Sequence, residues 1–376
     1  MTILFLHSIA IAPDKGGIER VTRTLTDGFL ERGHTVYFLA AKPTWKEFAD
    51  KERQFFLPNA KDFAALENAG YFERFLREHA VDAVIFQWAD GKRFPFGEIC
   101  RKLRVPVISA IHTDPCFYER RVRGSGMVKA IKRWWRFRRQ AKIYRENAAC
   151  SVTTVLLSER FIPGFLKHFP RTKKPSVCAM PNPSSYENVS VDFAAKKKEL
   201  LFVGRMEKRV KQPHLLLQAW KKIQARFPDW SLVMVGGGHE EAEIRAEAET
   251  LGLERVRFEG FQNPERFYRD ASVFCMASAY EGFPMVLVEA ASHACAPVAF
   301  DSFFAVRDII SDGENGCLVP AFDTEQYATV LCRLMADEAL RNGIARAAYR
   351  DVARFSLSKL LDRWTEILKE ARAIPE

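Results

Sequence analysis

The stretch VFCMASAYEGFPMVLVEAASHA at residues 273–294 decides the fold of this chain. Its first four residues form an apolar run, which predicts a buried strand of a parallel sheet. Small residues then lead to EGFP at 281–284, whose proline suits the first turn of a helix, so a helix is expected over 285–294. A strand followed directly by a helix is the repeating unit of α/β proteins with parallel sheets.

Two glutamates occupy different positions in this unit. Glu281 lies on the strand-to-helix loop and Glu289 lies inside the expected helix. The N–H groups of Gly282 and Phe283 are at the helix start, where backbone donors and the helix dipole favour a phosphate. The pattern predicts two carboxylates beside an anion site at the carboxyl edge of the sheet. The alternative is a chance spacing, with Glu289 at a solvated helix position.

The length and composition describe a globular protein of more than one domain. A chain of 376 residues exceeds one ordinary core, so two domains are expected. A hydrophobic fraction of 48% with 28% charged residues is ordinary, and no apolar run approaches bilayer-spanning length. MTILFLHSIA carries neither a basic leader nor a cleavage site, so no signal peptide is expected.

The cysteines predict no metal site. The eight cysteines include no Cys-x-x-Cys pair and no Cys/His cluster with zinc spacing. Cys275, Cys295 and Cys317 lie in apolar runs and are expected to be buried, reduced thiols. Reduced cysteines favour a cytoplasmic location.

The net charge of +10 predicts an anionic partner, which could be a nucleic acid, a membrane surface or a phosphorylated substrate. The most basic segment, 119–145, reads ERRVRGSGMVKAIKRWWRFRRQAKIYR and is expected to be helical from Met127. Its cations could hold lipid headgroups with the tryptophans in the interfacial layer, grip a nucleic-acid backbone, or form a solvated helix. We favour a membrane surface or an anionic acceptor.

The N-terminal half offers two further candidate positions. After an expected strand at 3–6, Gly16 and Gly17 open a helix, where paired glycines allow a ligand to approach the backbone. They could equally serve only a tight turn. A second apolar strand, at 105–112, ends in His112, which could bind a sugar hydroxyl or be a buried structural histidine.

The second half begins with an expected strand at 199–203. The loop after it carries Arg205, Lys208 and Lys211, and such cations can neutralise a diphosphate. A solvated basic loop is the alternative. The glycine turn at 236–238 lacks the full dinucleotide fingerprint, which disfavours hydride transfer.

EGFPMVLVEA, with Glu281 and Glu289 separated by seven residues, resembles the paired-glutamate motif of the retaining glycosyltransferases of family 4, the glycosyl transferases group 1. The resemblance covers most of the chain and is densest over 199–320. It implies an α/β fold of the GT-B type, with two Rossmann-like domains facing each other across a cleft.

The expected domain boundaries combine this resemblance with the breaker cluster at 181–185. Residues 1–181 would form a Rossmann-like acceptor domain and 182–198 the linker. Residues 199–355 would form the nucleotide-sugar donor domain, and a helix at 356–376 would return to the N-terminal domain.

The resemblance also implies a set of donor-binding positions. The catalytic positions beside the transferred sugar are Glu281 and His112. Those on the donor diphosphate are Gly16, Gly17, Arg205, Lys211, Gly282 and Phe283. The lysine could instead be Lys208, although Lys211 directly precedes a helix. Glu289 would bind the ribose, and Gly237 and Phe261 would border the base.

The function implied is sugar transfer with the anomeric configuration kept. The donor would be a nucleotide-diphosphate sugar with UDP as the expected nucleotide, and the acceptor a hydroxyl of a glycan or lipid-linked glycan in cell-surface polysaccharide or lipopolysaccharide assembly. No metal, no cofactor and no nucleic acid are expected. The protein would be cytoplasmic, with peripheral contact to the inner face of the membrane through 119–145.

Two alternatives stay open: a sugar-nucleotide epimerase or hydrolase on the same fold, and a non-catalytic protein that binds anionic glycans or nucleic acid. The donor sugar also stays open, because Ala305 and Val306 replace a Gly-Pro pair that family members often carry.

Overall fold

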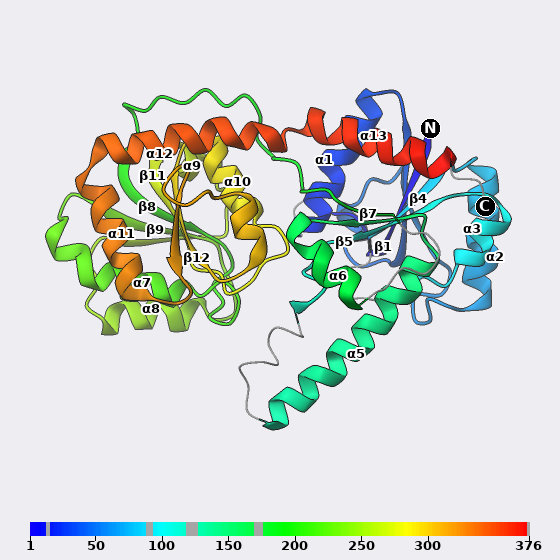
Figure 1. The fold of residues 1–376 in the computed structure, drawn as a ribbon, viewed down its shortest axis with the longest axis horizontal. Helices are drawn as coiled ribbons and strands as arrows, with labels where there is room; N and C mark the ends of the chain where they lie inside the picture. Colours follow the sequence, from blue (N-terminus) through cyan, green and yellow to red (C-terminus); the bar gives the residue numbers. More distant parts are fainter. Residues whose placement is uncertain (13–15, 88–92, 118–126, 169–175, 374–376) are drawn as a thin grey trace. The chain divides into compact units, whose positions relative to one another are not determined.

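The computed structural model describes residues 1–12, 16–87, 93–117, 127–168 and 176–373. The chain divides into two compact units (Figure 1). Unit 1 comprises Met1–Pro183 together with Leu357–Glu376, and unit 2 is the continuous segment Ser184–Ser356. Each unit is described below by itself.

Unit 1 is built on a parallel sheet of seven strands. The strands are β1 (Thr2–Ile9), β2 (Thr35–Lys42), β3 (Gln54–Phe56), β4 (Ala83–Gln87), β5 (Val107–Ile111), β6 (Thr153–Leu156) and β7 (Ser176–Ala179). Their order in the sheet is β3-β2-β1-β4-β5-β6-β7. The central strands are almost continuously apolar, because a parallel sheet covered on both faces buries every side chain.

The described helices of unit 1 come from both ends of its sequence. They are α1 (Gly17–Glu31), α2 (Leu66–Glu78), α3 (Gly97–Lys102), α5 (Met127–Ala149), α6 (Ile162–His168) and α13 (Leu357–Ala373), with 3-10 turns η1 (Lys46–Phe48) and η2 (Glu159–Phe161). The C-terminal helix α13 packs on α1 so closely that a Cβ on Gly28 would lie 2.3 Å from Cδ1 of Leu361. Arg32 on the loop after α1 pairs with Asp362 at 2.8 Å.

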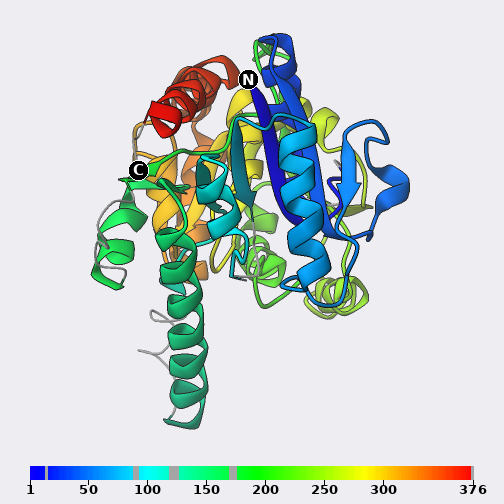
Figure 2. The ribbon, with the colours of Figure 1, turned by 90° about the vertical axis from the view of Figure 1, so that its right-hand side faces the viewer.

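The C-terminal end of helix α5 packs against unit 1. Ala141, Tyr144 and Ala148 are buried, and Oδ1 of Asn147 accepts a hydrogen bond from the backbone N–H of Phe94 at 2.7 Å. The N-terminal end of α5 extends away from the rest of unit 1 in both views (Figures 1 and 2).

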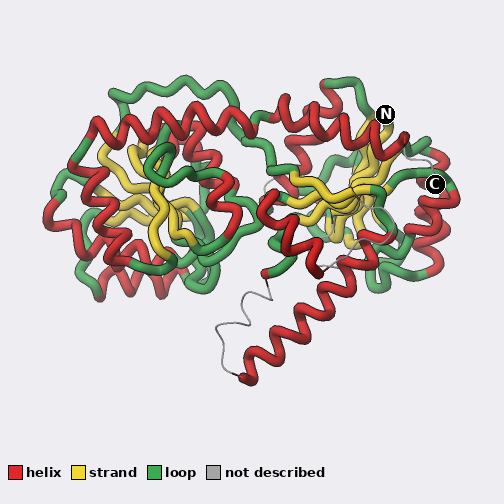
Figure 3. Tube along the Cα trace, viewed as in Figure 1, coloured by secondary structure: helices red, strands yellow, loops and turns green. Residues whose placement is uncertain are grey.

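Unit 2 contains a parallel sheet of six strands with helices on both faces (Figure 3). The strands are β8 (Lys197–Val203), β9 (Ser231–Val235), β10 (Val256–Gly260), β11 (Ala271–Met276), β12 (Ala296–Asp301) and β13 (Cys317–Pro320). The helices are α7 (Pro213–Ile223), α8 (Glu241–Thr250), α9 (Glu265–Asp270), α10 (Met285–Ser292), α11 (Thr324–Ala336) and α12 (Glu338–Asp351), with 3-10 turns η3 (Gln224–Arg226), η4 (Phe304–Asp308) and η5 (Val352–Phe355).

The strand order of unit 2, β10-β9-β8-β11-β12-β13, reverses direction between β8 and β11. These neighbouring strands pair in parallel, so the loops that follow them leave the same edge of the sheet side by side. Open α/β sheets bind ligands at this kind of reversal, at the carboxyl ends of the strands. Unit 1 has the corresponding reversal between β1 and β4.

The predicted α/β class with parallel sheets is confirmed, and several boundaries differ. β8 begins at Lys197, inside the expected linker 182–198. Residues 184–198 belong to unit 2, because Val191 and Phe193 pack against its core. Helix α10 begins at Met285, which places Pro284 at the N-cap instead of the first helical position.

Candidate active site

Lys211 and Glu281 meet at the carboxyl edge of unit 2. The ammonium of Lys211, which precedes α7, forms an ion pair with Oε1 of Glu281 on the loop between β11 and α10. Each side chain is 16% exposed, so the pair is mostly shielded from solvent. The two loops that converge here are those after β8 and β11, the strands between which the sheet order reverses.

Short hydrogen bonds hold the Glu281 loop in place. The hydroxyl of Ser278 donates to Oε1 of Glu281 at 2.9 Å, and its carbonyl accepts from Ser302 at 2.6 Å. The backbone N–H of Ala279 donates to the carbonyl of Val210 at 2.7 Å, which ties this loop directly to the lysine loop. The carboxylate is therefore oriented by Ser278 and Lys211, and its loop is held by the segments around Val210 and Ser302.

Lys208 takes a different position from Lys211. Its ammonium contacts Glu243 at 2.7 Å and Glu247 at 2.9 Å, both on α8. These hydrogen bonds raise the pKa of Lys208. The geometry thus favours Lys211 as the lysine of the site, and Lys208 fastens its loop to α8.

The side chain of Arg205 is 70% exposed and lies 3.4 Å from Glu207. Such a side chain can turn toward an anion at little cost, since exposed ion pairs of this kind are weak. Its fork of donors suits bidentate contact with phosphate oxygens.

At the helix start beside Glu281, the backbone and the side chain of Phe283 have different surroundings. Among the described residues, the N–H groups of Gly282 and Phe283 have no hydrogen-bond acceptor, so they are available at the N-terminus of α10. The ring of Phe283 is buried and packs against Phe355 at 5.4 Å. Only the backbone of Phe283 can therefore serve as the predicted diphosphate contact.

Gly237 and Phe261, the two positions predicted for the base region, lie together at the ends of β9 and β10. A Cβ on Gly237 would lie 3.6 Å from Cβ of Phe261. The ring of Phe261 is 84% exposed, which makes it a surface on which a planar base could stack. Next to them, Gly236 has φ of +133°, and a Cβ there would lie 2.0 Å from the carbonyl oxygen of Gly204.

Glu289 is completely buried on α10. The hydroxyl of Tyr268 donates to Oε2 of Glu289 at 2.9 Å, and Ser185 Oγ lies 3.4 Å from Oε1. A buried carboxylate is costly unless donors surround it, so these contacts stabilise Glu289 in the interior.

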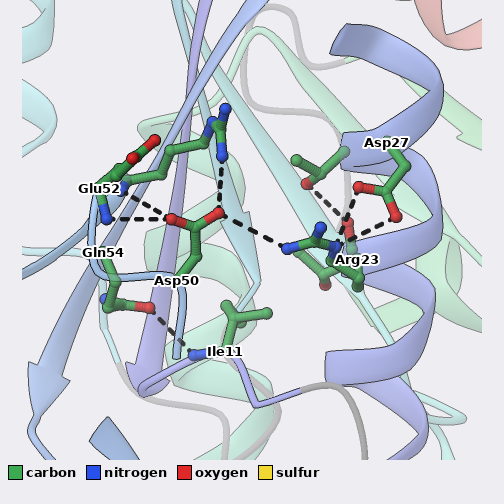
Figure 4. A network of polar contacts seen from close by, with 9 residues as sticks. Ile11, Arg23, Asp27, Asp50, Glu52 and Gln54 are labelled. Carbon is green, nitrogen blue, oxygen red and sulfur yellow. Dashed lines mark hydrogen bonds and ion pairs between the residues drawn. The ribbon is translucent and has the colours of Figure 1, made fainter. Parts of the chain in front are cut away.

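Gly16 and Gly17 lie at the start of α1 in unit 1. Gly16 is the N-cap, and a Cβ on Gly17 would meet no atom within 4 Å, so its backbone is open to a ligand. Figure 4 shows the polar network beside this segment, in which Oε1 of Gln54 accepts from the backbone N–H of Ile11 at 3.1 Å. Arg23 on α1 pairs with Asp50 at 3.6 Å, which fixes α1 to the loop before β3.

Asp50 is the centre of that network. Burial alone would raise the pKa of its carboxyl, but hydrogen bonds from the Arg53 side chain and from backbone N–H groups outweigh burial and lower it. The network therefore stays charged at neutral pH.

His112 lies just after β5. Both ring nitrogens are buried and have no hydrogen-bond partner among the described residues, although the residue as a whole is only half-buried. Burial, with a smaller contribution from His7, lowers the pKa of His112 to about 3. The imidazole is therefore neutral at physiological pH: one ring nitrogen can donate a hydrogen bond, the other can accept one, and the ring does not take up a second proton.

The basic segment predicted at 119–145 is described from Met127, where α5 begins; 119–126 lie outside the described residues. Between 127 and 145 the helix carries eight basic residues and no acidic one. Ile131 is 53% exposed and Trp135 is 64% exposed, and the guanidinium of Arg138 lies over the ring of Trp134 at 4.9 Å.

The cysteines are free thiols, and Cys275, Cys295 and Cys317 are buried as predicted. Burial raises the pKa of Cys275 to about 12, so this thiol is unreactive. Within the described part of the chain, no group of three or more His, Cys, Asp or Glu side chains is arranged to hold a metal ion. No described helix is both long enough and apolar enough to cross a membrane.

Three residues near the predicted positions were not found from the sequence: Ser278, Tyr268 and Ser185. Ser278 precedes Glu281 by three residues and could have been found, because a hydroxyl on the same short loop is within reach of the carboxylate. Tyr268 and Ser185 contact Glu289 from 21 and 104 residues away, and no local spacing indicates such contacts.

The two units, each a parallel sheet with helices on both faces, define a GT-B α/β protein. A family model described as "Glycosyl transferases group 1" matches residues 187–351, and one described as "Glycosyltransferase Family 4" matches residues 15–155. The chain belongs to this glycosyltransferase family, which confirms the resemblance read from Glu281 and Glu289.

Two relatives and one solved structure illustrate the similarity. The amylovoran biosynthesis glycosyltransferase AmsD of Erwinia amylovora is 34% identical over 178 residues, which cover 47% of this chain and 49% of AmsD. A Campylobacter jejuni GalNAc-GalNAc-diNAcBac-PP-undecaprenol α-1,4-N-acetyl-D-galactosaminyltransferase is 24% identical over 72% of this chain and 70% of its own length. A mutant of S. aureus TarM in complex with fondaparinux, α-GlcNAc-glycerol and UDP has a TM-score of 0.73 at 14% identity, covering 98% of this chain and 100% of TarM. The region of the chain that matches AmsD thus spans about half the length of AmsD.

Proposed function

We propose that this protein is a retaining, metal-independent glycosyltransferase that uses a UDP-sugar and an acceptor hydroxyl. The observation that carries the proposal is the contact of Lys211 with Glu281 where the strand order of unit 2 reverses. A cation and a carboxylate at that edge can stabilise the two opposite charges that develop in glycosyl transfer. The leaving diphosphate gains negative charge and the anomeric carbon gains positive charge.

The diphosphate would be bound by protein groups alone. Arg205 and Lys211 supply the cations, and the N–H groups of Gly282 and Phe283 supply donors at a helix start. Gly16 and Gly17, at the N-terminus of α1 in unit 1, would supply donors of the same kind. In the transfer, the bond from the anomeric carbon to the β-phosphate oxygen breaks, the acceptor oxygen bonds to that carbon, and the acceptor proton passes to the departing diphosphate oxygen.

The remaining residues would position the donor. Glu281 would contact the transferred sugar and steady positive charge at the anomeric carbon, and neutral His112 would hydrogen-bond a sugar hydroxyl. Glu289 would accept hydrogen bonds from the ribose, with the base lying beside Gly237 and Phe261. UDP is supported by the UDP present with TarM, a structure of the same fold.

The acceptor would be a glycan or a lipid-linked glycan of cell-surface polysaccharide or lipopolysaccharide assembly. The names of AmsD and of the undecaprenol-dependent Campylobacter enzyme support this class. Helix α5 supports contact with an anionic membrane, because exposed Ile131 and Trp135 lie among the cations of the helix. A nucleic-acid partner is disfavoured, since an exposed isoleucine has no role on a phosphate backbone.

The proposal is tested by turnover with UDP-, GDP- and ADP-sugars in the presence of EDTA, with proton NMR of the product to read its anomeric configuration. The expected result is sugar transfer from a UDP-sugar with retention, insensitive to EDTA. Sugar released mainly to water would indicate a hydrolase. No turnover, together with DNA binding that weakens steeply with salt, would indicate a binding protein.

Glu281→Gln tests the catalytic assignment. Turnover is expected to fall about 100-fold or more while UDP affinity stays within about 3-fold, because the carboxylate acts on the reacting centre. Glu314→Gln, an exposed position on the turn before β13, is the matched control. A fully active Glu281→Gln variant would remove Glu281 from the chemistry.

A further inference from the structure

Unit 1 has a concave surface at the edge of its sheet that lies opposite His112. This amino-edge hollow has a volume of about 670 Å³ and is lined by residues at the C-terminal ends of α3, α5 and α13. Val107, the first residue of β5, and Val152, just before β6, also line it. His112 follows the other end of β5, so the length of that strand, roughly 16 Å, separates it from the hollow.

The charged side chains that line the amino-edge hollow are all arginines. They are Arg101 on α3, Arg104 on the turn before β5 and Arg372 on α13, and no described Asp or Glu belongs to the lining. The side chains of Arg101 and Arg104 form no hydrogen bond or ion pair within the described part of the chain, and both residues are exposed. Arg372 is 49% exposed and lies 3.1 Å from Asp82. Two guanidinium groups beside the hollow are therefore available to a ligand.

The helix dipole explains only part of this arrangement. Cations are favoured at helix C-termini, which accounts for Arg101 and Arg372. Arg104 lies outside any helix and has φ of +56°, a left-handed conformation that glycine usually occupies after a helix. A side chain at such a position costs on the order of 1 kcal/mol. The local backbone therefore does not favour an arginine here.

The chemistry of the amino-edge hollow suits a phosphate group. A guanidinium is a planar fork of donors that matches phosphate oxygens, and several cations around one concave surface attract an anion more strongly than one cation does. The remaining wall is mainly apolar, with buried Cys100, Val107 and Ala371. The volume lies within the range of about 300–1,000 Å³ that small-molecule sites occupy, which leaves room for more than the phosphate itself.

We infer that the amino-edge hollow binds a small molecule that carries a phosphate or diphosphate group, with Arg101 and Arg104 as its main contacts and Arg372 beside them. This site goes beyond the proposed function, because neither the sugar donor nor the acceptor is needed to fill it. Its ligand would bind at the edge of unit 1 remote from His112 and would not compete with the donor.

Inorganic pyrophosphate is a suitable probe, because it carries the recognised group and nothing else. Isothermal titration calorimetry of the full chain in 150 mM salt is expected to show two binding sites. Arg101→Gln combined with Arg104→Gln should weaken one site by about 10-fold or more, as expected for lost hydrogen bonds between charged groups. Arg205→Ala combined with Lys211→Met should weaken only the other site.

Two matched controls test where the anion binds. Lys42→Gln with Lys61→Gln removes the same number of charges from exposed positions elsewhere on unit 1 and should leave both sites unchanged. Ala149→Glu places a carboxylate at an exposed position on the lining of the hollow, and should weaken the first site by about 10-fold through repulsion. Ala64→Glu, the same change at an exposed alanine that does not line the hollow, should have no effect.

Each outcome bears on one of the two sites. A single pyrophosphate site that the Arg205 and Lys211 variant abolishes would overturn the inference. Equal weakening by the two double variants of unit 1, or an Ala149→Glu protein with wild-type affinity, would also overturn it, because the anion would then bind outside the hollow. If the site weakened by the Arg101 and Arg104 variant is present and the other is absent, the inference stands and the diphosphate assignment in unit 2 fails.

Discussion

Lys211 and Glu281 form an ion pair in which each side chain is only 16% exposed. The contact joins the loops after β8 and β11, which are distant in sequence and adjacent in the sheet. A diphosphate entering this edge would compete with Glu281 for the ammonium. The pair therefore keeps the lysine in place before a donor arrives.

Replacing Lys211 by methionine should lower kcat/KM by about 100-fold or more, because a preorganised charge at the leaving group is lost. Lys208→Met is the control, since Lys208 pairs with Glu243 and Glu247 on α8. It should leave kcat/KM near that of the wild type and cost at most about 1 kcal/mol of the free energy of unfolding. Steady-state kinetics of the two variants decide between the lysines; equal losses would contradict the assignment.

Arg205→Ala should weaken UDP binding by about 10-fold while leaving the melting temperature unchanged, because the side chain is 70% exposed and contributes little to folding. Arg205→Lys should restore only part of the affinity, since a single ammonium replaces a bidentate fork. Calorimetry with UDP checks both variants. An Arg205→Ala protein with wild-type affinity would place the diphosphate elsewhere.

Gly236→Ala should cost about 3 kcal/mol or more of the free energy of unfolding, because the new Cβ would lie 2.0 Å from the Gly204 carbonyl at φ of +133°. The neighbouring Gly237→Ala has its nearest contacts at 3.5 Å and 3.6 Å, and should cost less than about 1 kcal/mol. Urea unfolding compares the two substitutions. Gly237→Ala should still weaken nucleotide binding, since it narrows the space beside Phe261.

His112 should make stability depend on acid pH. Its folded-state pKa is about 3, below the usual value of 6.5, so the unfolded chain binds one more proton between these values. The free energy of unfolding should therefore fall as pH drops below 6.5, by up to about 1.4 kcal/mol per pH unit from this residue, with no effect above it. Urea unfolding at pH 5 and 7.5 should show a smaller difference for His112→Phe than for wild type. An equal difference in both proteins would contradict the buried, neutral imidazole.

Binding of α5 to vesicles of anionic lipid should depend on the basic and aromatic residues of its exposed stretch 131–139. Arg138→Gln combined with Arg139→Gln should lower partitioning by about 30-fold, at about 1 kcal/mol per cation near the surface. Trp135→Ser should lower it further and make the remaining binding more sensitive to salt. Lys42→Gln with Lys61→Gln, exposed cations elsewhere on unit 1, is the control in a vesicle sedimentation assay. Equal binding of both double variants would show that net charge alone is responsible.

The sequence predicted the class of fold and the loops of the candidate site, because strand-helix alternation and loop residues are local signals. Lys211 and Glu281 each lie on a loop directly after a strand, so their edge of the sheet could be predicted. The preference for Lys211 over Lys208 gained support from two tertiary contacts: Lys211 pairs with Glu281, and α8 holds Lys208 through Glu243 and Glu247. That contact joins segments more than 30 residues apart and leaves no local pattern.

The tertiary contacts that orient Glu289 could not be predicted for the same reason. Its position inside a helix suggested a solvent-facing or ligand-facing carboxylate, and the structure buries it under α9. The backbone and the side chain of Phe283 also have different roles, which a sequence motif does not distinguish. Its backbone N–H is available to a ligand, whereas its ring packs in the core against Phe355. The short edge strand β3 lacks the apolar length by which strands are recognised.

The chain enters unit 2 once and leaves it once. The N–H of its first residue, Ser184, donates to the carbonyl of Phe355 at 2.8 Å, so the two ends of the segment are joined by one hydrogen bond. Unit 1 is split and needs α13, which follows unit 2 in the chain, to cover α1. During synthesis on the ribosome, unit 2 can therefore complete its fold first, and the unit encoded first is the one that finishes last.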